Sequence, residues 1–487
     1  MKQSRILNNA FNWFVRPYLL TRFLFERLSA DTIGREFSTC IHRRKMIKKL
    51  TAAAAAASLA LALTACGSSD SGEEAAASCE TKTEVTMLGT IKVEIQDQFL
   101  AATEDYNASQ DCYTIVSVAN DADSFLGGVT PMYAAGEAPV LMTTLQELPD
   151  MADKVMDWTG TELAGLAAEG TLQAANIKGK QVGIPVTAEA FGLLYNKAVL
   201  DEAGVDPAAI KTRDDLKAAF DAVEATGRSA IHFSGLWWSL GAHLTNIYHT
   251  TVSSDREARF QVFDGLADGT YDLTADAQWN NWLDAFDLMK EYDINGGKSI
   301  ADDEYDSAVL DLAEGNVGFW FMGNWAEPNL LQTTPDGSFG VMPLPISNEA
   351  GAYGNDSISV GVPFYFIIDE EQSTEAERAG AIDFLTWLIT TPEGQMHYAG
   401  PIDQDNMSFI PVYSGFTVSP ATYMANEIAT YIAAGKTLEW MNSYYPAEPG
   451  QLAYGASGQK YITGKIDRAG FAASYQADWK GSTKSWR

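Results

Sequence analysis

Large aromatic side chains recur beside turn residues in this sequence. An indole or phenol ring offers a flat apolar surface on which the weakly apolar face of a pyranose can stack, while carboxylates, amides and backbone groups replace the water that its hydroxyls lose. Core packing is the alternative role of any single Trp, and it suits Trp320, inside the apolar run 317–322. The pattern therefore indicates carbohydrate chemistry at loops and strand ends. The aromatic residues concerned are Trp237, Trp238, Trp320, Trp325, Trp440, Tyr444 and Tyr445.

Catalytic and metal-binding templates are missing from the sequence. It contains no GxSxG, no HExxH and no GxGxxG after a predicted strand. The 64 acidic residues place carboxylates near any cleft, so carboxylates alone do not indicate a glycosidase. We therefore expect no enzymatic activity, no metal and no cofactor. The histidines without metal-ligand spacing, each expected to be structural, are His232, His243, His249 and His397.

The charge balance is strongly acidic, with 33 basic and 64 acidic residues and a formal net charge of -31 at pH 7. Such a surface repels phosphate backbones, which argues against nucleic-acid binding. The length of 487 residues predicts two or three compact units, and an apolar share of 46% is enough for substantial cores.

An export signal precedes the predicted mature chain. Lys48 and Lys49 lead into the apolar run 50–65, which has the length of a secretory signal and is too short to span a bilayer comfortably. The run ends in Leu-Thr-Ala-Cys, which resembles a lipobox and predicts Cys66 as the lipidated first residue of the mature chain. Residues 66–79 then read as a flexible tether. The alternative is a signal without lipidation that is cleaved nearby.

Residues 1–45 fit no known targeting pattern, and we exclude them from reasoning about the fold. Translation begins at Met46, or else Arg43 and Arg44 form a loose twin-arginine signal that needs the upstream start. We favour Met46, with 46–65 as the signal peptide.

Two cysteines of the predicted mature chain precede runs that read as strands. Cys79 comes before residues 84–88, and Cys112 comes directly before residues 113–118. Adjacent parallel strands would put both sulfur atoms at the same end of a sheet, so we predict a disulfide in this exported chain. Two buried free thiols are the alternative.

Short apolar runs alternate with amphipathic stretches after residue 80, which is typical of an α/β protein with largely parallel strands. Ligands of such sheets lie outside the carboxyl ends of the strands. The strands are expected at 84–88, 113–118, 140–143, 183–185, 192–196, 317–322 and 359–368, and the helices at 95–107, 124–135, 213–226, 279–292, 375–390 and 394–398.

Three segments resemble family 1 extracellular solute-binding proteins, the group that includes maltodextrin-binding proteins. Residues 179–197 read GKQVGIPVTAEAFGLLYNK and are followed by KTRDDL. Residues 312–326 read LAEGNVGFWFMGNWA and are followed by MPLP. Residues 381–395 contain AIDFLTWL and TPEGQ. Their order and spacing extend the resemblance over nearly all of residues 80–487.

The resemblance implies a two-lobe periplasmic-binding-protein-like fold with crossing hinge segments. The first lobe would comprise 80–187 and 361–436, and the second 188–360 and 437–487. A carbohydrate would bind in the cleft between them and pass to the permease subunits of an ABC importer. We expect a monomer held at the outer face of the cell membrane by its lipid anchor alone.

Ligand-binding residues follow from the resemblance where the motifs align. Trp325 matches a Trp that stacks on sugar, and Glu189 matches a hinge carboxylate that accepts hydroxyl hydrogens. Trp237 and Trp238 fall where the family places an aromatic pair on the second lobe. The further expected ligand-binding residues are Thr90, Gln146 and Glu147 on the first lobe, Asn324 beside Trp325, Trp440, Tyr444 and Tyr445 near the third crossing, and Gln451 at a C-terminal stacking position.

Departures from the maltodextrin binders change the expected ligand. The turn at Thr90 lacks their charged residues, and no aromatic residue matches their C-terminal stacking site, where Gln451 stands. The sequence therefore favours a different oligosaccharide or a disaccharide. Alternatives are the same fold with a phosphodiester or peptide ligand, which the missing Arg cluster opposes, and a secreted glycoside hydrolase.

Overall fold

The structure is a computed structural model that describes residues 79, 81–88, 96–120, 122, 124–168, 170–296, 304–398, 410–416, 422–447 and 450–486. The expected signal peptide, the lipidation site at Cys66, the tether up to residue 78 and the expected ligand-binding residue Thr90 lie outside these residues. The chain divides into the unit 1–76 and the unit 77–487, and the fold below is that of the second unit.

The first sheet has five strands in the order β2-β1-β3-β12-β6. β1 and β2 run parallel in a register that pairs Thr83 with Tyr113, and Cys79 and Cys112 form a disulfide at this end of the sheet, with Cα atoms 5.0 Å apart. The strands are β1 (Thr83–Leu88), β2 (Tyr113–Val118), β3 (Leu141–Thr144), β6 (Ile184–Pro185) and β12 (Tyr365–Ile368). The helices around this sheet are α3 (Gln96–Ser109), α4 (Phe125–Ala135), α5 (Leu148–Met151), α6 (Glu162–Leu166), α14 (Glu375–Thr390) and α15 (Pro392–Tyr398). A short ribbon of β4 (Asn176–Ile177) and β5 (Lys180–Gln181) is separate.

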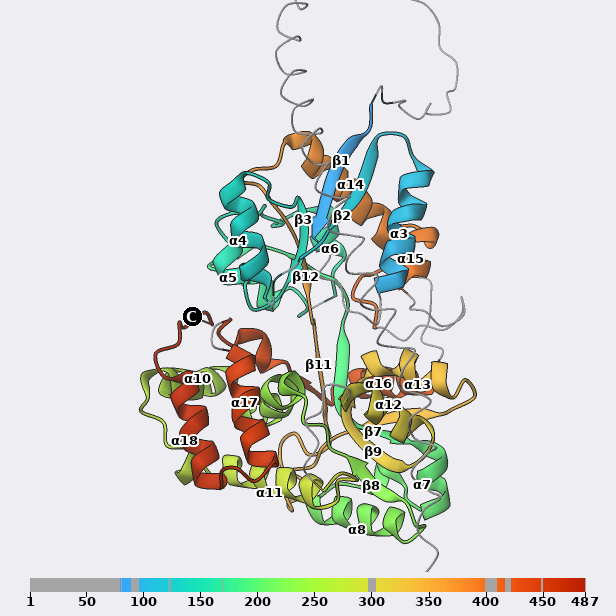
Figure 1. The fold of residues 1–487 in the computed structure, drawn as a ribbon, viewed down its shortest axis with the longest axis vertical. Helices are drawn as coiled ribbons and strands as arrows, with labels where there is room; N and C mark the ends of the chain where they lie inside the picture. The colour runs from blue at the N-terminus through green and yellow to red at the C-terminus, as the bar shows by residue number, and fades with distance from the viewer. Residues whose placement is uncertain are drawn as a thin grey trace, which may run out of the picture. The chain divides into compact units, whose positions relative to one another are not determined.

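The second sheet has the order β13-β11-β7-β9-β8, with β10 paired to β7. Its strands are β7 (Glu189–Asn196), β8 (Ser229–His232), β9 (Val317–Gly323), β10 (Phe339–Met342), β11 (Ile358–Gly361) and β13 (Thr437–Glu439). Helices α10, α11, α17 and α18 lie together beside it (Figure 1). The helices of this part are α7 (Lys197–Ala203), α8 (Arg213–Glu224), α9 (Thr245–Thr251), α10 (Arg256–Asp268), α11 (Ala277–Glu291), α12 (Glu304–Ala313), α13 (Glu327–Thr333), α16 (Tyr423–Ala433), α17 (Gly450–Ile462) and α18 (Arg468–Trp479).

Local sequence explains why individual elements form where they do. α8 buries Leu216, Ala219, Phe220 and Val223, a spacing that puts all four on one helical face. The side chain of Thr212 accepts a hydrogen bond from the backbone at the third helical position, whose own carboxylate accepts one in return, so this helix begins with a capping box.

Two expectations about the strands are wrong. The sheets are mixed rather than largely parallel, because β12 runs antiparallel to β3 and β6, and β7 runs antiparallel to β9, β10 and β11. The run 359–368, expected to be one strand, forms β11 in the second sheet and β12 in the first. Pro363 lies between the two strands and lacks the backbone donor that a continuous ladder requires.

Connecting segments therefore link the two sheets. Residues 186–188 lead from β6 to β7, and residues 362–364 lead from β11 back to β12. α16 packs against β10 and buries Met424 and Ile428 in the core of the second sheet, although it falls within the range expected for the first lobe.

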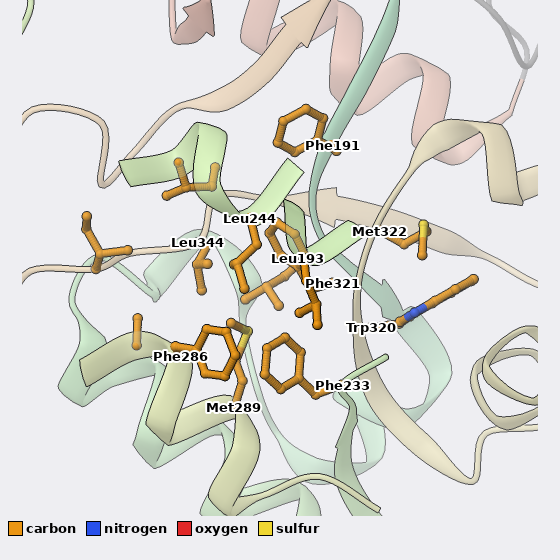
Figure 2. Packing of buried hydrophobic residues seen from close by; sticks show 14 of the residues in the cluster. Phe191, Leu193, Phe233, Leu244, Phe286, Met289, Trp320, Phe321, Met322 and Leu344 are labelled. Carbon is orange, nitrogen blue, oxygen red and sulfur yellow. The ribbon is translucent and has the colours of Figure 1, made fainter. Parts of the chain in front are cut away.

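Each sheet has its own hydrophobic core. In the second, Phe233 and Phe286 meet edge to face with ring centroids 4.9 Å apart, close to Met289 (Figure 2). Trp320 and Phe321 leave β9 on opposite sides, as neighbouring residues of a strand must (Figure 2). Trp320 is fully buried and its Nε1 donates to Ser234 Oγ over 2.8 Å, which is the core role that the sequence indicated. Within the described part of the chain, no helix combines the length and apolar character needed to cross a membrane.

Candidate functional site

A polar cavity lies at the carboxyl ends of two strands of the first sheet. It measures about 350 Å³, and its lining includes Asn120 after β2 and the segment Thr143–Glu147 at the end of β3. This is the position at which open α/β sheets bind ligands. The Thr144 hydroxyl donates to the Glu147 carboxylate, which fixes that side chain beside the cavity. The structure thus brings Gln146 and Glu147, both expected from the sequence, into one site.

Gln146 also connects this site to the segment that follows β13. Its Nε2 lies 3.5 Å from the backbone oxygen of Asn442, at the limit of a hydrogen bond. Asn442 is buried, and its backbone nitrogen donates to Asn246 Oδ1 over 3.2 Å. A residue of the first-sheet cavity therefore lies against the segment that carries Trp440, Tyr444 and Tyr445.

The segment 233–238 after β8, which we call the aromatic loop, presents an aromatic pair in the helical turn at its end. Trp237 is 41% exposed, whereas Trp238 is half-buried and meets Trp325 edge to face with ring centroids 6.3 Å apart. The Gly235 oxygen in this loop accepts a hydrogen bond from Gln459 Nε2 over 2.8 Å, which holds the loop to α17. An indole that stays this exposed on a firmly held loop is available for stacking.

Trp325 lies in the same aromatic cluster but is covered. Only 2% of it is exposed, and its ring packs against His243 at 4.8 Å and Phe191 at 6.5 Å between centroids. Its predicted contact with ligand therefore needs a change in the side chains that cover it.

Glu189 is the first residue of β7, and Asn324 directly follows β9 and contacts the start of β7. Asn324 is fully buried, and its Oδ1 accepts from the backbone nitrogen of Ala190 over 2.8 Å. Glu189 is 1% exposed and pairs with Gly361 of β11. Asn324 thus fixes the strand that carries Glu189, and the predicted direct contacts of both residues with ligand remain predictions.

The residues after β13 take different positions. Tyr445 is buried, and its hydroxyl is 3.0 Å from Thr245 Oγ1, so it belongs to the core. The Tyr444 hydroxyl accepts from Arg256, whose guanidinium carbon lies 5.0 Å from the Tyr444 ring centroid, and burial raises the pKa of that phenol. Trp440 is 3% exposed and packs on Phe191 at 5.2 Å between ring centroids.

Gln451 lies in the first turn of α17, half-buried. A Cβ added to Gly241 would lie 2.2 Å from the Gln451 backbone oxygen. A glycine is therefore required where α17 touches the π-helix Ser239–Leu244, which contains Gly241. The structure shows this backbone contact for Gln451 rather than a stacking role.

Sequence reasoning missed two groups in this region. Asn120 and Ser124 line the first-sheet cavity, and the rule of carboxyl strand ends would have found Asn120, because it follows the predicted strand 113–118. His243 was expected to be structural, and only the fold places it among the aromatic rings. Within the residues that the structure describes, no three His, Cys, Asp or Glu side chains gather as metal ligands.

Known proteins with similar sequences and folds share this architecture. The model of bacterial extracellular solute-binding proteins matches residues 101–430. An arabinooligosaccharide-binding protein from Halalkalibacterium halodurans is 30% identical over 186 residues, which cover 36% of this chain and 37% of that protein. The chain thus matches little more than a third of the length of this relative.

Solved structures extend the likeness to nearly whole chains. The solute-binding protein RafE in complex with raffinose has a TM-score of 0.64 at 17% identity, covering 82% of this chain and 99% of that one. A sugar transporter protein from Bacillus licheniformis in complex with stachyose has a TM-score of 0.62 at 18% identity, covering 81% and 98%. At such identities the likeness establishes the fold. The match over residues 101–430 shows that this chain belongs to the bacterial extracellular solute-binding proteins, a family of binding proteins rather than enzymes.

Proposed function

We propose that this protein is the oligosaccharide-binding subunit of an ABC importer. One observation carries the proposal: the exposed indole of Trp237 stands on a held loop of the second sheet, while a polar cavity opens at the strand ends of the first. An aromatic plate with hydroxyl, amide and carboxylate groups is the combination that a pyranose requires.

The first-sheet cavity favours a neutral polyhydroxylated ligand over an anion. Its described polar lining residues are Asn120, Ser124, Thr143, Thr144, Gln146 and Glu147, and among the lining residues that the structure describes none is cationic. A phosphodiester or carboxylate ligand would need an Arg or Lys to replace its hydration. Sugar hydroxyls instead can donate to Glu147 and exchange hydrogen bonds with the amides.

The comparisons support an oligosaccharide rather than a monosaccharide. The sequence relative is named for arabinooligosaccharides, and two structural neighbours hold raffinose and stachyose. The expected residues belong to this proposal as ligand-binding groups, apart from Tyr445, which lies in the core, and Gln451, whose backbone contacts Gly241. The proposal also includes delivery of the ligand to the permease subunits and lipidation of Cys66. The protein would be a monomer at the outer face of the cell membrane.

A thermal-shift panel tests the proposal directly. The panel contains arabino-oligosaccharides, raffinose, stachyose and malto-oligosaccharides, with a phosphodiester and a peptide as non-sugar arms. A ligand at 100 times its dissociation constant adds about 2.7 kcal/mol to the stability of the folded protein, which a thermal melt resolves. We expect a shift with at least one oligosaccharide and none with the non-sugar arms.

Matched variants then connect binding to the site. Trp237→Ala removes the exposed indole, and Tyr353→Ala removes a similarly exposed ring, 43% exposed, that lies on the loop after residue 347. The proposal requires Trp237→Ala to weaken sugar binding by tenfold or more and Tyr353→Ala to leave it unchanged. A shift with the phosphodiester or peptide alone would refute the sugar assignment.

A further inference from the structure

The stretch that follows the aromatic loop contains one partly exposed residue. It begins as a π-helix, Ser239–Leu244, and continues as α9. Every other residue from 239 to 251 is buried, whereas His243 is partly exposed. π-helical turns are rare and occur often at functional sites, because the widened turn places a side chain where an α-helix would not.

Four aromatic rings from four different segments surround the His243 imidazole. The distances between ring centroids are 4.7 Å to Phe191 in β7, 4.8 Å to Trp325, 5.5 Å to Trp238 and 5.8 Å to Trp440. Three of these rings are among the four tryptophans that the sequence indicated as sugar-binding. His243 is therefore the polar ring at the centre of an aromatic cluster in which Trp238 is half-buried and Trp325 and Trp440 are covered.

The backbone around His243 is held by close packing. A Cβ on Gly455 of α17 would lie 2.0 Å from the Trp237 backbone oxygen, and Gly241 touches the same helix. Two glycines thus let α17 support both the aromatic loop and the π-helix at contact distance. A group held in this way loses little conformational entropy when it binds ligand.

The chemistry of the imidazole differs from that of its neighbours. Phenylalanine and tryptophan rings provide stacking surfaces, and an indole nitrogen can only donate, whereas a neutral imidazole has one donor and one acceptor nitrogen. A hydroxyl can donate to a neutral imidazole or accept from it, and because Nδ1 of His243 is buried, a sugar hydroxyl would have to reach Nε2. Stacking tolerates many sugars, but a directed hydrogen bond distinguishes one hydroxyl orientation from another.

We propose that His243 is a specificity-determining residue of the sugar site, hydrogen-bonded to a hydroxyl of the sugar that stacks on the aromatic pair Trp237 and Trp238. This inference rests on the proposed function and adds to it the residue that selects among hydroxyl configurations.

Two substitutions separate hydrogen bonding from packing. His243→Phe keeps an aromatic ring among the four neighbours and removes both nitrogens. His243→Gln removes the ring and keeps a donor and an acceptor. Dissociation constants are measured by calorimetry for the tightest oligosaccharide of the panel and for an epimer that differs in one hydroxyl. We expect His243→Phe to weaken the preferred sugar by tenfold or more and to reduce its preference over the epimer. We expect His243→Gln to stay within about threefold, because the amide keeps a donor and an acceptor at this position.

A spectroscopic measurement keeps the test decisive if a variant folds poorly. In the wild-type protein with isotope-labelled histidine, saturating sugar should shift the imidazole resonances that His243→Gln removes. Unchanged resonances, or His243→Phe binding both epimers as the wild type does, would overturn the inference while the sugar-binding function stands. A wild-type protein that binds no sugar of the panel would instead refute the proposed function itself.

Discussion

Glu327 offers a pH-dependent test of the packing beneath the site. It is the first residue of α13, two residues after Trp325, and only 2% of it is exposed. Thr422, which caps α16, donates from Oγ1 to the Glu327 carboxylate over 2.9 Å. Burial raises the pKa of this carboxyl from 4.5 to about 8, against the lowering effect of the Thr422 hydrogen bond.

Because its pKa is raised, Glu327 holds its proton more tightly in the folded protein than in the unfolded chain. Its contribution to stability is therefore complete below pH 4.5 and is lost as the pH rises toward 8. A pKa difference of one between the folded and unfolded states corresponds to about 1.4 kcal/mol, so ionisation of this group costs roughly 4 to 5 kcal/mol of folding free energy at alkaline pH.

Glu327→Gln keeps the size and the acceptor of the side chain and removes the ionisation. We expect the substitution to raise the free energy of unfolding above that of the wild type at pH 8. The increase should be about 3 kcal/mol larger at pH 8 than at pH 5, where the carboxyl is already protonated. Urea unfolding followed by tryptophan fluorescence at pH 5, 6, 7 and 8 measures the difference. Glu349→Gln, at an exposed position, is the control and should show no such dependence. Equal effects of Glu327→Gln at pH 5 and pH 8 would refute the reasoning.

Three further predictions concern stability and the site. Burial lowers the pKa of His249 to about 3, so the free energy of unfolding falls as the pH drops below 6.5, by about 2 kcal/mol at pH 5. His249→Gln should flatten this acid dependence in urea titrations. An unchanged slope would contradict the prediction. Replacing Cys79 and Cys112 by Ser opens a loop of 33 residues and should cost roughly 3 to 4 kcal/mol, measured against the oxidised protein, whereas a loss below 1 kcal/mol would exclude a stabilising cross-link. Gly455→Ala adds a methyl group 2.0 Å from the Trp237 oxygen and should displace the aromatic loop, lowering both the melting temperature and sugar affinity; unchanged values of both would count against the close packing.

Elements with a strong local pattern were predictable from the sequence. Helix 375–390 and strand 113–118 coincide with α14 and β2, because a capping Thr defines the helix start and an apolar run defines the strand. The run 359–368 was not predictable in the same way. Pro363 indicates a break within the run, but only the packing assigns β11 and β12 to different sheets.

The sequence predicted which segments contribute to the site better than it predicted the contacts that each side chain makes there. Trp237 was expected from its position beside turn residues, and the cavity residues Gln146 and Glu147 were expected from the family resemblance. Tyr445 has the same sequence context as Tyr444 yet is buried against Thr245, because its orientation depends on α9, far away in sequence. The same long-range packing places His243 among the aromatic rings, and no residue spacing in the sequence predicts this position.

A crystal structure of the protein with the tightest oligosaccharide of the panel tests the central claim most directly. We predict a pyranose ring stacked on Trp237, with hydroxyls within hydrogen-bond distance of Glu147 or Gln146. An oligosaccharide bound away from both the Trp237 loop and the first-sheet cavity would contradict the claim.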